Sequence, residues 1–223
     1  MEKCFALILS CEKYTHKRLM QNMNDFPFEY RYFLGKPGLD KPVEDGKIVY
    51  LPCPDNYESL PIKVRLGINW IVENIHDVSY IFKTDDDIKF NGPELLKLYE
   101  EEVAGKSLDY AGNRVKVVEH LSVYHQGACE SDFLNGSSLC IPDVMYCSGG
   151  GYFLSKKSFN ILNQSTNYKK YPFLESYKDL IFEDVWTGGI LNYFSIFPKS
   201  IPIRGSCIWG AQGERGEIKK WTI

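Results

Sequence analysis

Short apolar runs alternate with amphipathic stretches through the first half of the chain. Residues 4–9, 30–34 and 48–51 are apolar runs of strand length, each bounded by polar or turn-forming residues. Between residues 57 and 75 the apolar positions recur at steps of three and four, which predicts a helix with one buried face. Residues 80–82 predict a further short, buried strand. This alternation predicts an α/β sheet flanked by helices.

The second half of the chain is less regular. We expect residues 110–118 to be extended, in two segments, and the second segment to pair with residues 121–125. Residues 127–142 are polar and predict an irregular stretch. The three glycines at residues 149–151 favour neither strand nor helix, and they allow close approach of the backbone to another group. Residues 183–191 open with two acids and continue as an apolar, helix-like run.

Composition restricts the class of protein. The chain has 223 residues, of which 44% are hydrophobic, and this is enough for a large core. No linker-like stretch or repeat divides it, so we expect a single domain over residues 1–223. The formal net charge of -3 and the pI near 5.9 argue against a nucleic-acid partner. The seven cysteines include no Cys-x-x-Cys pair, which argues against a zinc site and favours buried free thiols.

The sequence also bears on the compartment. The first strand-like run begins at residue 4, which leaves no room for a signal peptide, and no apolar run has the length of a membrane span. We therefore expect a soluble, cytoplasmic protein. A location in the secretory lumen would require that the sequence is a truncated piece of a longer chain.

Three consecutive carboxylates, Asp85, Asp86 and Asp87, follow the strand predicted at residues 80–82. In a partly buried cleft such charges repel by roughly 1 kcal/mol or more per pair, and a divalent cation keeps them ionised together. Mg²⁺ or Mn²⁺ is usually held by one or two carboxylates together with substrate phosphates, so we expect a nucleotide diphosphate as partner. The alternative is a solvated acidic turn, but α/β sheets bind ligands at the carboxyl ends of their strands.

Three blocks carry a family signature: Lys-Thr-Asp-Asp-Asp-Ile at residues 83–88 followed by Asn91, Tyr-Cys-Ser-Gly-Gly-Gly-Tyr-Phe-Leu-Ser at residues 146–155, and Glu-Asp-Val-Trp-Thr-Gly at residues 183–188. Together they resemble the β-1,3-glycosyltransferases of the galactosyltransferase and fringe type. Weaker similarities at residues 32–35 and 55–63 extend the resemblance over roughly residues 30–190, in matching order and spacing.

The resemblance implies a GT-A fold, which is a single Rossmann-like α/β/α sandwich with a mostly parallel central sheet and a small accessory sheet. It implies a nucleotide-binding half near residues 1–92 and an acceptor-binding half near residues 93–223. The implied activity is metal-dependent, inverting transfer of a hexose (galactose, glucose or N-acetylglucosamine) from a UDP-sugar to a hydroxyl of a glycan or glycoconjugate, with a β-1,3 linkage. The expected ligands are therefore a UDP-sugar donor and Mn²⁺ or Mg²⁺.

The resemblance also implies roles for the acidic residues. Asp87 would ligate the metal, and Asp85 would contact the ribose and the metal-bound phosphates as a second ligand. Asp184 would be the catalytic base that takes the acceptor's proton, with Glu183 as its competitor. The structural alternative for this pair is a helix N-terminus, where acids are favoured by the helix dipole.

Further residues border the predicted site. The candidates on the nucleotide side are Tyr14, Tyr57, Lys63, Thr84 and Asp86. The candidates beside the donor and acceptor sugars are Gly149, Gly150, Gly151, Tyr152, Glu183 and Trp186. Each type has a structural alternative, because helix lysines are usually solvated, glycine runs can form turns, and a tryptophan near a helix start is usually core.

The sequence departs from the family pattern in two respects. Relatives begin with a membrane anchor and stem, which this sequence does not include, and they supply a late histidine to the metal, whereas His16, His76, His120 and His125 all precede residue 183. Water would then complete the metal site. Two other functions stay open: a UDP-sugar-binding module of the same fold with weak or no turnover, and a metal-dependent phosphoryl hydrolase.

Overall fold

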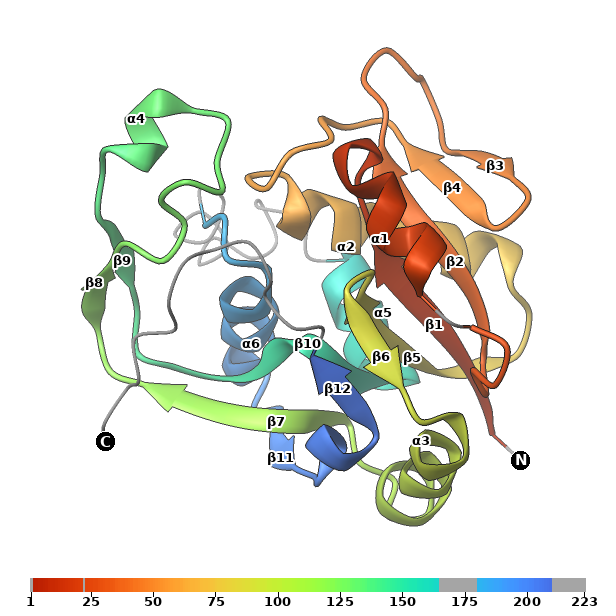
Figure 1. The fold of residues 1–223 in the computed structure, drawn as a ribbon. Coiled ribbons are helices and arrows are strands. Elements are labelled where there is room, and N and C mark those ends of the chain that lie inside the picture. The colour runs from red at the N-terminus through yellow and green to blue at the C-terminus, as the bar shows by residue number, and fades with distance from the viewer. Residues whose placement is uncertain (1, 22, 165–179, 210–223) are drawn as a thin grey trace.

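An eight-stranded sheet forms the centre of the molecule. The structure, a computed structural model, describes residues 2–21, 23–164 and 180–209 (Figure 1). The strand order is β11-β7-β10-β5-β1-β2-β4-β3. In chain order these strands are β1 (Lys3–Leu9), β2 (Glu29–Gly35), β3 (Val43–Asp45), β4 (Ile48–Leu51), β5 (Val78–Asp85), β7 (Tyr110–Val117), β10 (Val144–Ser155) and β11 (Lys199–Ser200).

Most of the central strands are parallel. β5, β1, β2 and β4 are parallel to their neighbours in that order, and β7 is parallel to β11. β10 runs antiparallel to both β5 and β7, and β3 runs antiparallel to β4. The predicted Rossmann-like α/β architecture with a mostly parallel sheet is therefore confirmed.

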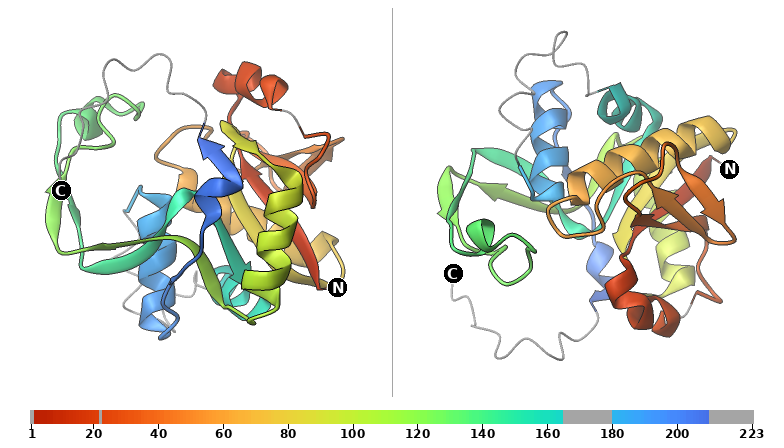
Figure 2. Two further views of the ribbon diagram at one scale, coloured as in Figure 1. Left: turned by 60° about the horizontal axis from the view of Figure 1, so that its bottom comes forward. Right: turned by 90° about the horizontal axis from the view of Figure 1, so that it is seen from above.

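Helices cover both faces of the sheet (Figure 2). The helical elements in the described residues are α1 (Thr15–Met20) after a 3₁₀ turn (Glu12–Tyr14), α2 (Leu60–Asn74), α3 (Gly92–Leu98) continued by a π-helical turn (Tyr99–Ala104), α4 (Asp132–Asn135), α5 (Lys156–Gln164), α6 (Glu183–Tyr193) and a 3₁₀ turn (Ile203–Gly205). α2, α5 and α6 lie together on one face, and α3 lies on the other. In the described part of the chain, no helix combines the length and the apolar character needed to cross a membrane.

The alternation of side chains along β1 explains the two core layers. Phe5 and Leu7 pack in the cluster beneath α2, α5 and α6, whereas Ala6 and Ile8 pack in the cluster on the side of α3. All four are completely buried. A parallel strand covered on both faces reads as a continuous apolar run, which is why β1 was predictable from its sequence.

The glycines at residues 149–151 lie inside β10, so the prediction that they would avoid regular structure is wrong. β10 pairs with β7 up to Cys147 and again from Tyr152, and the register shifts between these two positions. Gly151 meanwhile pairs with Thr84 on β5. The glycines thus form an irregularity in a strand, which directs this part of the backbone toward the end of β5.

Two small sheets in the described segments lie outside the central sheet, whereas the resemblance implied one small accessory sheet. β8 (His120–Ser122) pairs with β9 (Leu139–Ile141), not with the preceding strand β7, and the prediction for residues 121–125 is wrong in its partner. Residues 127–142 were expected to be irregular but contain α4 and β9. β6 (Ile88–Phe90) pairs with β12 (Cys207–Trp209). The six cysteines whose side chains the structure describes are free thiols: Cys4, Cys11, Cys53, Cys129, Cys140 and Cys147.

Candidate functional site

The three consecutive aspartates differ in exposure. β5 ends at Asp85, and Asp86 and Asp87 form the turn that leads into β6. The side chains of Asp85 and Asp87 are 37% and 50% exposed, whereas Asp86 is buried. The backbone N–H of Asp86 donates to the carbonyl of Leu9 at the end of β1, which fixes the turn against the neighbouring strand. Two of the three carboxylates are therefore available to a ligand.

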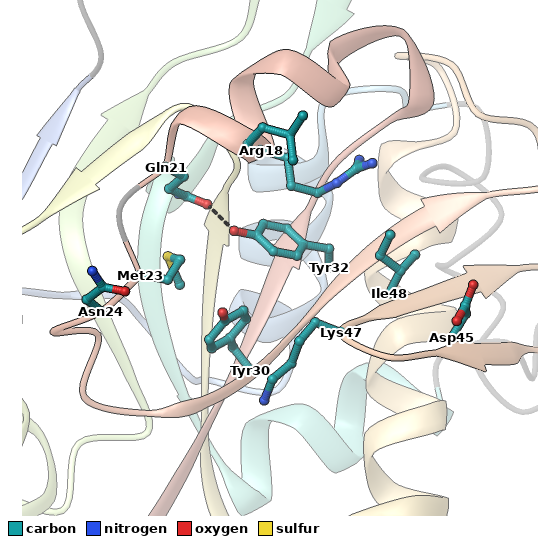
Figure 3. Close-up of a pocket in the computed structure, with 10 residues that line it drawn as sticks. Arg18, Gln21, Met23, Asn24, Tyr30, Tyr32, Asp45, Lys47 and Ile48 are labelled. Atoms are coloured by element: carbon teal, nitrogen blue, oxygen red, sulfur yellow. Dashed lines mark hydrogen bonds between the residues drawn. The ribbon is translucent and has the colours of Figure 1, made fainter.

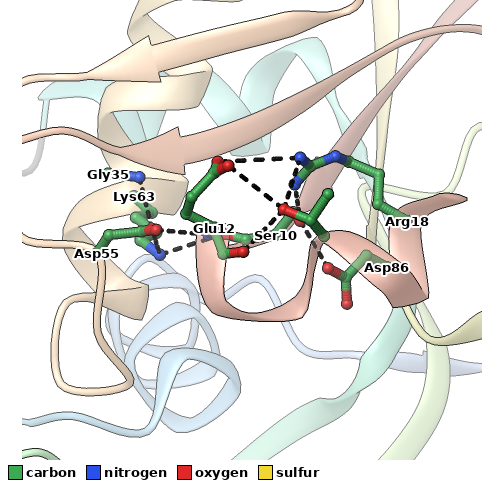
Figure 4. Close-up of polar contacts among 8 residues, drawn as sticks. Ser10, Glu12, Arg18, Gly35, Asp55, Lys63 and Asp86 are labelled. Carbon is green, nitrogen blue, oxygen red and sulfur yellow. Dashed lines mark hydrogen bonds and ion pairs between the residues drawn. The ribbon is translucent and has the colours of Figure 1, made fainter.

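The Asp86 carboxylate is directed toward Ser10 (Figure 4). Its Oδ2 accepts a hydrogen bond from the Ser10 hydroxyl at 2.6 Å, and Arg18 Nη1 donates to the same hydroxyl at 3.0 Å. The exposed Asp87 Oδ2 lies 3.3 Å from Lys17 Nζ. Asp86 thus supports the turn, and the prediction that it also contacts the nucleotide stays a prediction.

Lys83 connects the acidic turn to two distant segments. Its side chain is 2% exposed, and its ammonium lies 2.9 Å from Asp85 Oδ1 and 2.6 Å from Glu183 Oε2. It also donates to the carbonyl of Gly149 at 2.7 Å. Burial alone would lower the pKa of Lys83, but the charges of the two carboxylates raise it above its ordinary value. The lysine is therefore a buried cation between β5, β10 and α6.

Glu183 has both carboxylate oxygens engaged. Oε2 pairs with Lys83, and Oε1 accepts a hydrogen bond from the Tyr152 hydroxyl. The Thr187 hydroxyl lies 3.4 Å from Oε1, one helical turn along α6. The residue is buried at the first position of the helix. This arrangement makes Glu183 a structural acid and leaves little freedom for it to accept a proton from a substrate.

Asp184 is the less buried member of the pair. Its Oδ1 accepts from the backbone N–H of Val185 at 2.9 Å, and its Oδ2 accepts from the N–H of Gly149 at 3.3 Å. Burial raises the pKa of Asp184 to about 6; the charge of Glu183 raises it further, while Lys83 and the two N–H groups lower it. A carboxylate with a pKa near 6 is suited to general-base chemistry near neutral pH.

Asp85 carries the second perturbed carboxylate of this network. Burial raises the pKa of Asp85 to about 7, against the lowering effect of Lys83, and the charges of Glu183 and Asp87 add to the rise. One ammonium therefore faces more negative charge than it neutralises. Carboxylates perturbed by burial and by like charges are a physical sign of a functional site.

Two tyrosines, Tyr57 and Tyr146, lie near the Asp184 carboxylate. Burial raises the pKa of Tyr146 to about 12 and also raises that of Tyr57, and in both cases the next contribution is the charge of Asp184. Tyr124, which follows β8 and is largely exposed, adds to both shifts. The predicted Tyr57 thus lies near the base candidate, whereas Tyr146 and Tyr124 were not singled out from the sequence.

Lys63 belongs to a separate ion pair (Figure 4). Its side chain is 1% exposed, and its ammonium lies 2.5 Å from Asp55 Oδ1 and 3.2 Å from the carbonyl of Ser10. Asp55 also accepts backbone hydrogen bonds from Gly35 and Glu12. The structure therefore places Lys63 as a tie between α2 and the loop after β1, and contact with a diphosphate stays a prediction.

The comparison with known families bears directly on these residues. The sequence profile of the galactosyltransferase family matches residues 40–200, more than half of the chain. The chain belongs to this family. The matched region includes the aspartates at the end of β5, the glycines of β10 and the acids that open α6.

Individual relatives are distant and longer. Over 90 residues the chain is 29% identical to β-1,3-galactosyltransferase 4 of Canis lupus familiaris, which covers 34% of this chain and 24% of the relative. Over 152 residues it is 25% identical to UDP-GalNAc:beta-1,3-N-acetylgalactosaminyltransferase 1 of Rattus norvegicus, which covers 68% of this chain and 42% of the relative. The chain thus spans less than half the length of these two relatives.

A solved structure also aligns with most of the chain. It is the crystal structure of a glycosyltransferase involved in the glycosylation of the major capsid of PBCV-1, with a TM-score of 0.45 and 11% sequence identity. The alignment covers 90% of this chain and 82% of that one.

The donor set of this galactosyltransferase-family chain fits a hard divalent ion. Asp85 and Asp87 offer partly exposed carboxylate oxygens, the ligand type that Mg²⁺ and Mn²⁺ prefer. Within the described residues no cluster of three or more His, Cys, Asp or Glu side chains is arranged to hold a metal. Two carboxylates completed by substrate phosphates and water remain the expected arrangement for such an ion.

The remaining predicted residues differ in how directly they contact the site. The Thr84 hydroxyl donates to the carbonyl of Gly150 at 2.8 Å and so joins β5 to the glycine segment. Tyr152 is completely buried and reaches the site through Glu183, and Trp186 packs in the main core cluster, which favours its structural alternative. Tyr14 is linked to the acidic turn through Lys17, whose Nζ lies 4.4 Å from the Tyr14 ring centroid and 3.3 Å from Asp87 Oδ2.

A cavity of about 590 Å³ lies apart from these residues (Figure 3). It is bordered by α1 and by β2 and β4, and its lining includes Arg18, Tyr30, Tyr32 and Lys47. The Tyr32 hydroxyl donates to Gln21 across it at 2.9 Å. None of the residues predicted to hold the nucleotide, metal or sugars lines this cavity.

Sequence reasoning assigned no role to Lys83, although a signal was present. The lysine continues the apolar run of β5, and a lysine in a buried strand requires a charged partner. The identity of that partner, Glu183, could not be deduced because it lies a hundred positions further along the chain.

Proposed function

We propose that this chain is a metal-dependent, inverting glycosyltransferase. It moves a hexose from a UDP-sugar to a hydroxyl group of a glycan or glycoconjugate and forms a β-1,3 linkage. The observation that carries the proposal is the network of Lys83, Asp85, Glu183 and Gly149, with Asp184 joined to it through the Gly149 N–H. It brings the donor-side carboxylates and the candidate base to one end of the sheet.

In this proposal the donor side is formed by the end of β5. Asp85 and Asp87 would hold Mn²⁺ or Mg²⁺, and their exposure leaves oxygens for that role. When bound, the ion stabilises the negative charge of the departing UDP diphosphate as a Lewis acid. Lys17, 3.3 Å from Asp87, adds positive charge beside the same diphosphate.

Asp184 acts as the general base. Its carboxylate takes the proton of the acceptor hydroxyl as that oxygen attacks the anomeric carbon, and a raised pKa makes it a stronger base than an ordinary aspartate. Glu183 does not serve in this role because Lys83 and Tyr152 occupy its two oxygens. Its function is to hold Lys83 and the start of α6 in place.

The acceptor enters on the side of the tyrosines. Tyr57 and Tyr146 are partly exposed and lie near Asp184, so their rings offer flat apolar surfaces to a sugar beside the base. Tyr124 widens this surface from the segment after β8. The family members named above act on UDP-GalNAc or transfer galactose by name, which supports a hexose donor.

The test is UDP release and sugar transfer by the purified chain. UDP-galactose, UDP-glucose, UDP-N-acetylglucosamine and UDP-N-acetylgalactosamine are each supplied with a mixture of glycan acceptors, with Mn²⁺ and with EDTA. We expect release with one of these donors, dependent on both Mn²⁺ and acceptor. Asp184→Asn should lower kcat by at least roughly 100-fold, the usual contribution of a general base. Asp40→Asn, an exposed carboxylate after β2, is the matched control and should leave kcat unchanged.

Other outcomes separate the alternatives. Tight UDP binding without release from any donor indicates a binding module that lacks turnover. Metal-dependent UDP release that needs no acceptor and survives Asp184→Asn indicates a phosphoryl hydrolase. Either outcome contradicts the transferase proposal.

A further inference from the structure

Lys83 is a charged residue in the buried part of a central strand. It lies in β5 between Phe82 and Thr84, both completely buried, and its own side chain is 2% exposed. A lysine ammonium has three N–H donors and no acceptor. Here the ammonium has three acceptors within 3 Å, Asp85 Oδ1, Glu183 Oε2 and the Gly149 carbonyl. All three donors of Lys83 are therefore used by protein groups.

The three acceptors belong to three different elements. Asp85 ends β5, Gly149 lies in the irregular part of β10, and Glu183 opens α6. These elements carry, respectively, the proposed metal ligand Asp85, the glycine segment and the proposed base. The Lys83 ammonium contacts all three of these elements directly.

The position of Asp184 depends on two of these acceptors. Gly149 accepts from Lys83 through its carbonyl and donates to Asp184 through its N–H. Glu183 precedes Asp184 in the first turn of α6 and is held by Lys83 on one side and by Tyr152 on the other. If the ammonium were absent, Gly149, which donates to the Asp184 carboxylate, and Glu183, which precedes Asp184 in the helix, would each lose a hydrogen bond.

We propose that Lys83 is a positioning residue for glycosyl transfer, which fixes Asp184 relative to the donor-side Asp85 by binding Gly149 and Glu183 together. This inference rests on the proposed function, because it takes Asp184 as the base. Lys83 itself contacts no substrate, since its donors are directed to protein groups.

Stability alone does not account for an ammonium at this place. Apolar residues of similar volume stabilise a core as well as a buried ion pair does, because they carry no desolvation cost. What an ion cluster adds is directional hydrogen bonding that defines the distances between its members. In this chain those members include the proposed metal ligand Asp85 and the neighbours of the proposed base Asp184, whose mutual distances a transfer reaction requires to be fixed.

The kinetic test uses Lys83→Met, which keeps much of the side-chain volume and removes the three donors. Lys106→Met, at a surface lysine paired with Glu102, is the control. We expect Lys83→Met to lower kcat by about 100-fold, the effect of misplacing a reacting group by about 1 Å, with KM for the UDP-sugar changed by less than about threefold. Lys83→Arg keeps the charge and should recover at least about tenfold of the loss. A wild-type kcat in Lys83→Met, or a raised KM with kcat intact, overturns the inference.

A second measurement is independent of turnover. The amides of Gly149 and Val185 both donate to Asp184, so their hydrogen exchange reports how firmly that carboxylate is held. In the ligand-free protein we expect exchange at both amides to be at least about tenfold faster in Lys83→Met than in wild type or Lys106→Met. If Lys83→Met does not fold, Glu183→Gln serves instead, since it removes the charge held by Lys83 and keeps an acceptor for Tyr152.

The two readouts separate the inference from the proposed function. Unchanged exchange overturns the positioning of Asp184 by Lys83 even if the wild-type chain proves to be a transferase. Faster exchange in a chain that transfers no sugar overturns the proposed function, while the hold of Lys83 on Asp184 stands. Faster exchange together with a lowered kcat supports both.

Discussion

Two lysines are buried near the carboxyl ends of the central strands, and they differ in charge balance. Lys63, on α2, pairs with a single carboxylate, that of Asp55, at 2.5 Å. Lys83, on β5, lies between the carboxylates of Asp85 and Glu183. Both ammonium groups are almost completely removed from water, so each must be compensated by the protein. One carboxylate balances the charge of Lys63, whereas two carboxylates exceed the charge of Lys83.

The difference separates a structural ion pair from a reactive one. Asp55 is held by its lysine and by two backbone N–H groups, which leaves a neutral, satisfied cluster. Around Lys83, Asp184 adds a third carboxylate to the two that contact the ammonium, and the pKa values of Asp85 and Asp184 are raised to about 7 and about 6. Partly exposed carboxylates with excess negative charge can bind either a metal cation or a proton.

The largest expected effect on stability comes from breaking the balanced pair. Lys63→Met leaves the Asp55 carboxylate without its cation and the Ser10 carbonyl without a donor. We expect the free energy of unfolding to fall by about 3 kcal/mol, the usual result of removing one member of a buried pair. Urea denaturation of Lys63→Met and of the surface control Lys106→Met measures it, and the control should change by less than about 0.5 kcal/mol. Equal losses in the two variants would show that the Lys63 pair is not structural.

Neutralising a carboxylate that pairs with Lys83 should lower the free energy of unfolding by less. Glu183→Gln leaves Lys83 with Asp85 and the Gly149 carbonyl, and the amide oxygen can still accept from Tyr152. We expect a loss of about 1.5 kcal/mol, the value of one charge-assisted hydrogen bond. The comparison variant is Asp55→Asn, for which we expect about 3 kcal/mol because its lysine has no second carboxylate. A larger loss in Glu183→Gln than in Asp55→Asn would contradict the difference in charge balance.

The pH dependence follows from the two raised pKa values. In the unfolded chain both carboxyls ionise near pH 3.9, whereas in the folded protein Asp184 ionises near 6 and Asp85 near 7. Between these values the folded state binds more protons, so the contribution of these groups to stability falls as pH rises from about 4 to about 7. Because the Asp85 side chain is 37% exposed, water screens its charge, and we expect no more than about 1 kcal/mol from the pair.

Urea titrations across this pH range measure the effect as a difference between variants. Asp184→Asn should flatten the decline between about pH 4 and pH 6, and Asp40→Asn should leave it as in wild type. The same carboxylate should set the acidic limb of kcat/KM, with an apparent pKa near 6. A wild-type protein that gains stability relative to Asp184→Asn as pH rises through this window would contradict the direction of the shift.

The balanced and unbalanced clusters also show what the sequence could and could not predict. β1 was predictable because its apolar run is buried on both faces of the sheet, and β4 because its four residues are apolar and alternate between buried and partly buried positions. The acidic turn was predictable because its charges are consecutive. The family resemblance, confirmed by the match over residues 40–200, supplied the two acids that open α6. Local pattern and a known signature were sufficient for these elements.

Pairing over long distances was not predictable. β8 is separated from β9 by a loop and by α4, and nothing in either short strand specifies its partner. The contact of Lys83 with Glu183 joins β5 to α6, and a single sequence contains no signal for such a contact. The glycines of β10 were misassigned because intrinsic propensity, which disfavours glycine in strands, was overridden by pairing with β5 and β7.

Gly149→Ala should give the smallest change in stability, but it should still lower activity. The added methyl would lie 3.4 Å from Glu183 Oε2, 3.6 Å from Lys83 Nζ and 3.8 Å from Asp184 Cβ, which are ordinary contact distances. Gly149 has no left-handed backbone conformation, so alanine is compatible and the free energy of unfolding should change by less than about 0.5 kcal/mol. The methyl would nevertheless stand among the three groups whose spacing the reaction requires, and we expect kcat to fall by about tenfold.

The matched control is Gly136→Ala at the end of α4, where the added methyl meets Asp132 O at 3.5 Å and no member of the Lys83 network. It should change neither stability nor kcat, since its backbone is also compatible with alanine. Steady-state kinetics and urea denaturation of the two variants decide the outcome. If Gly149→Ala loses stability and activity together, the network around Lys83 is as structural as that around Lys63. The proposed difference between the two lysines would then be wrong. If kcat alone falls, the unbalanced cluster is the one in which small displacements affect chemistry more than folding.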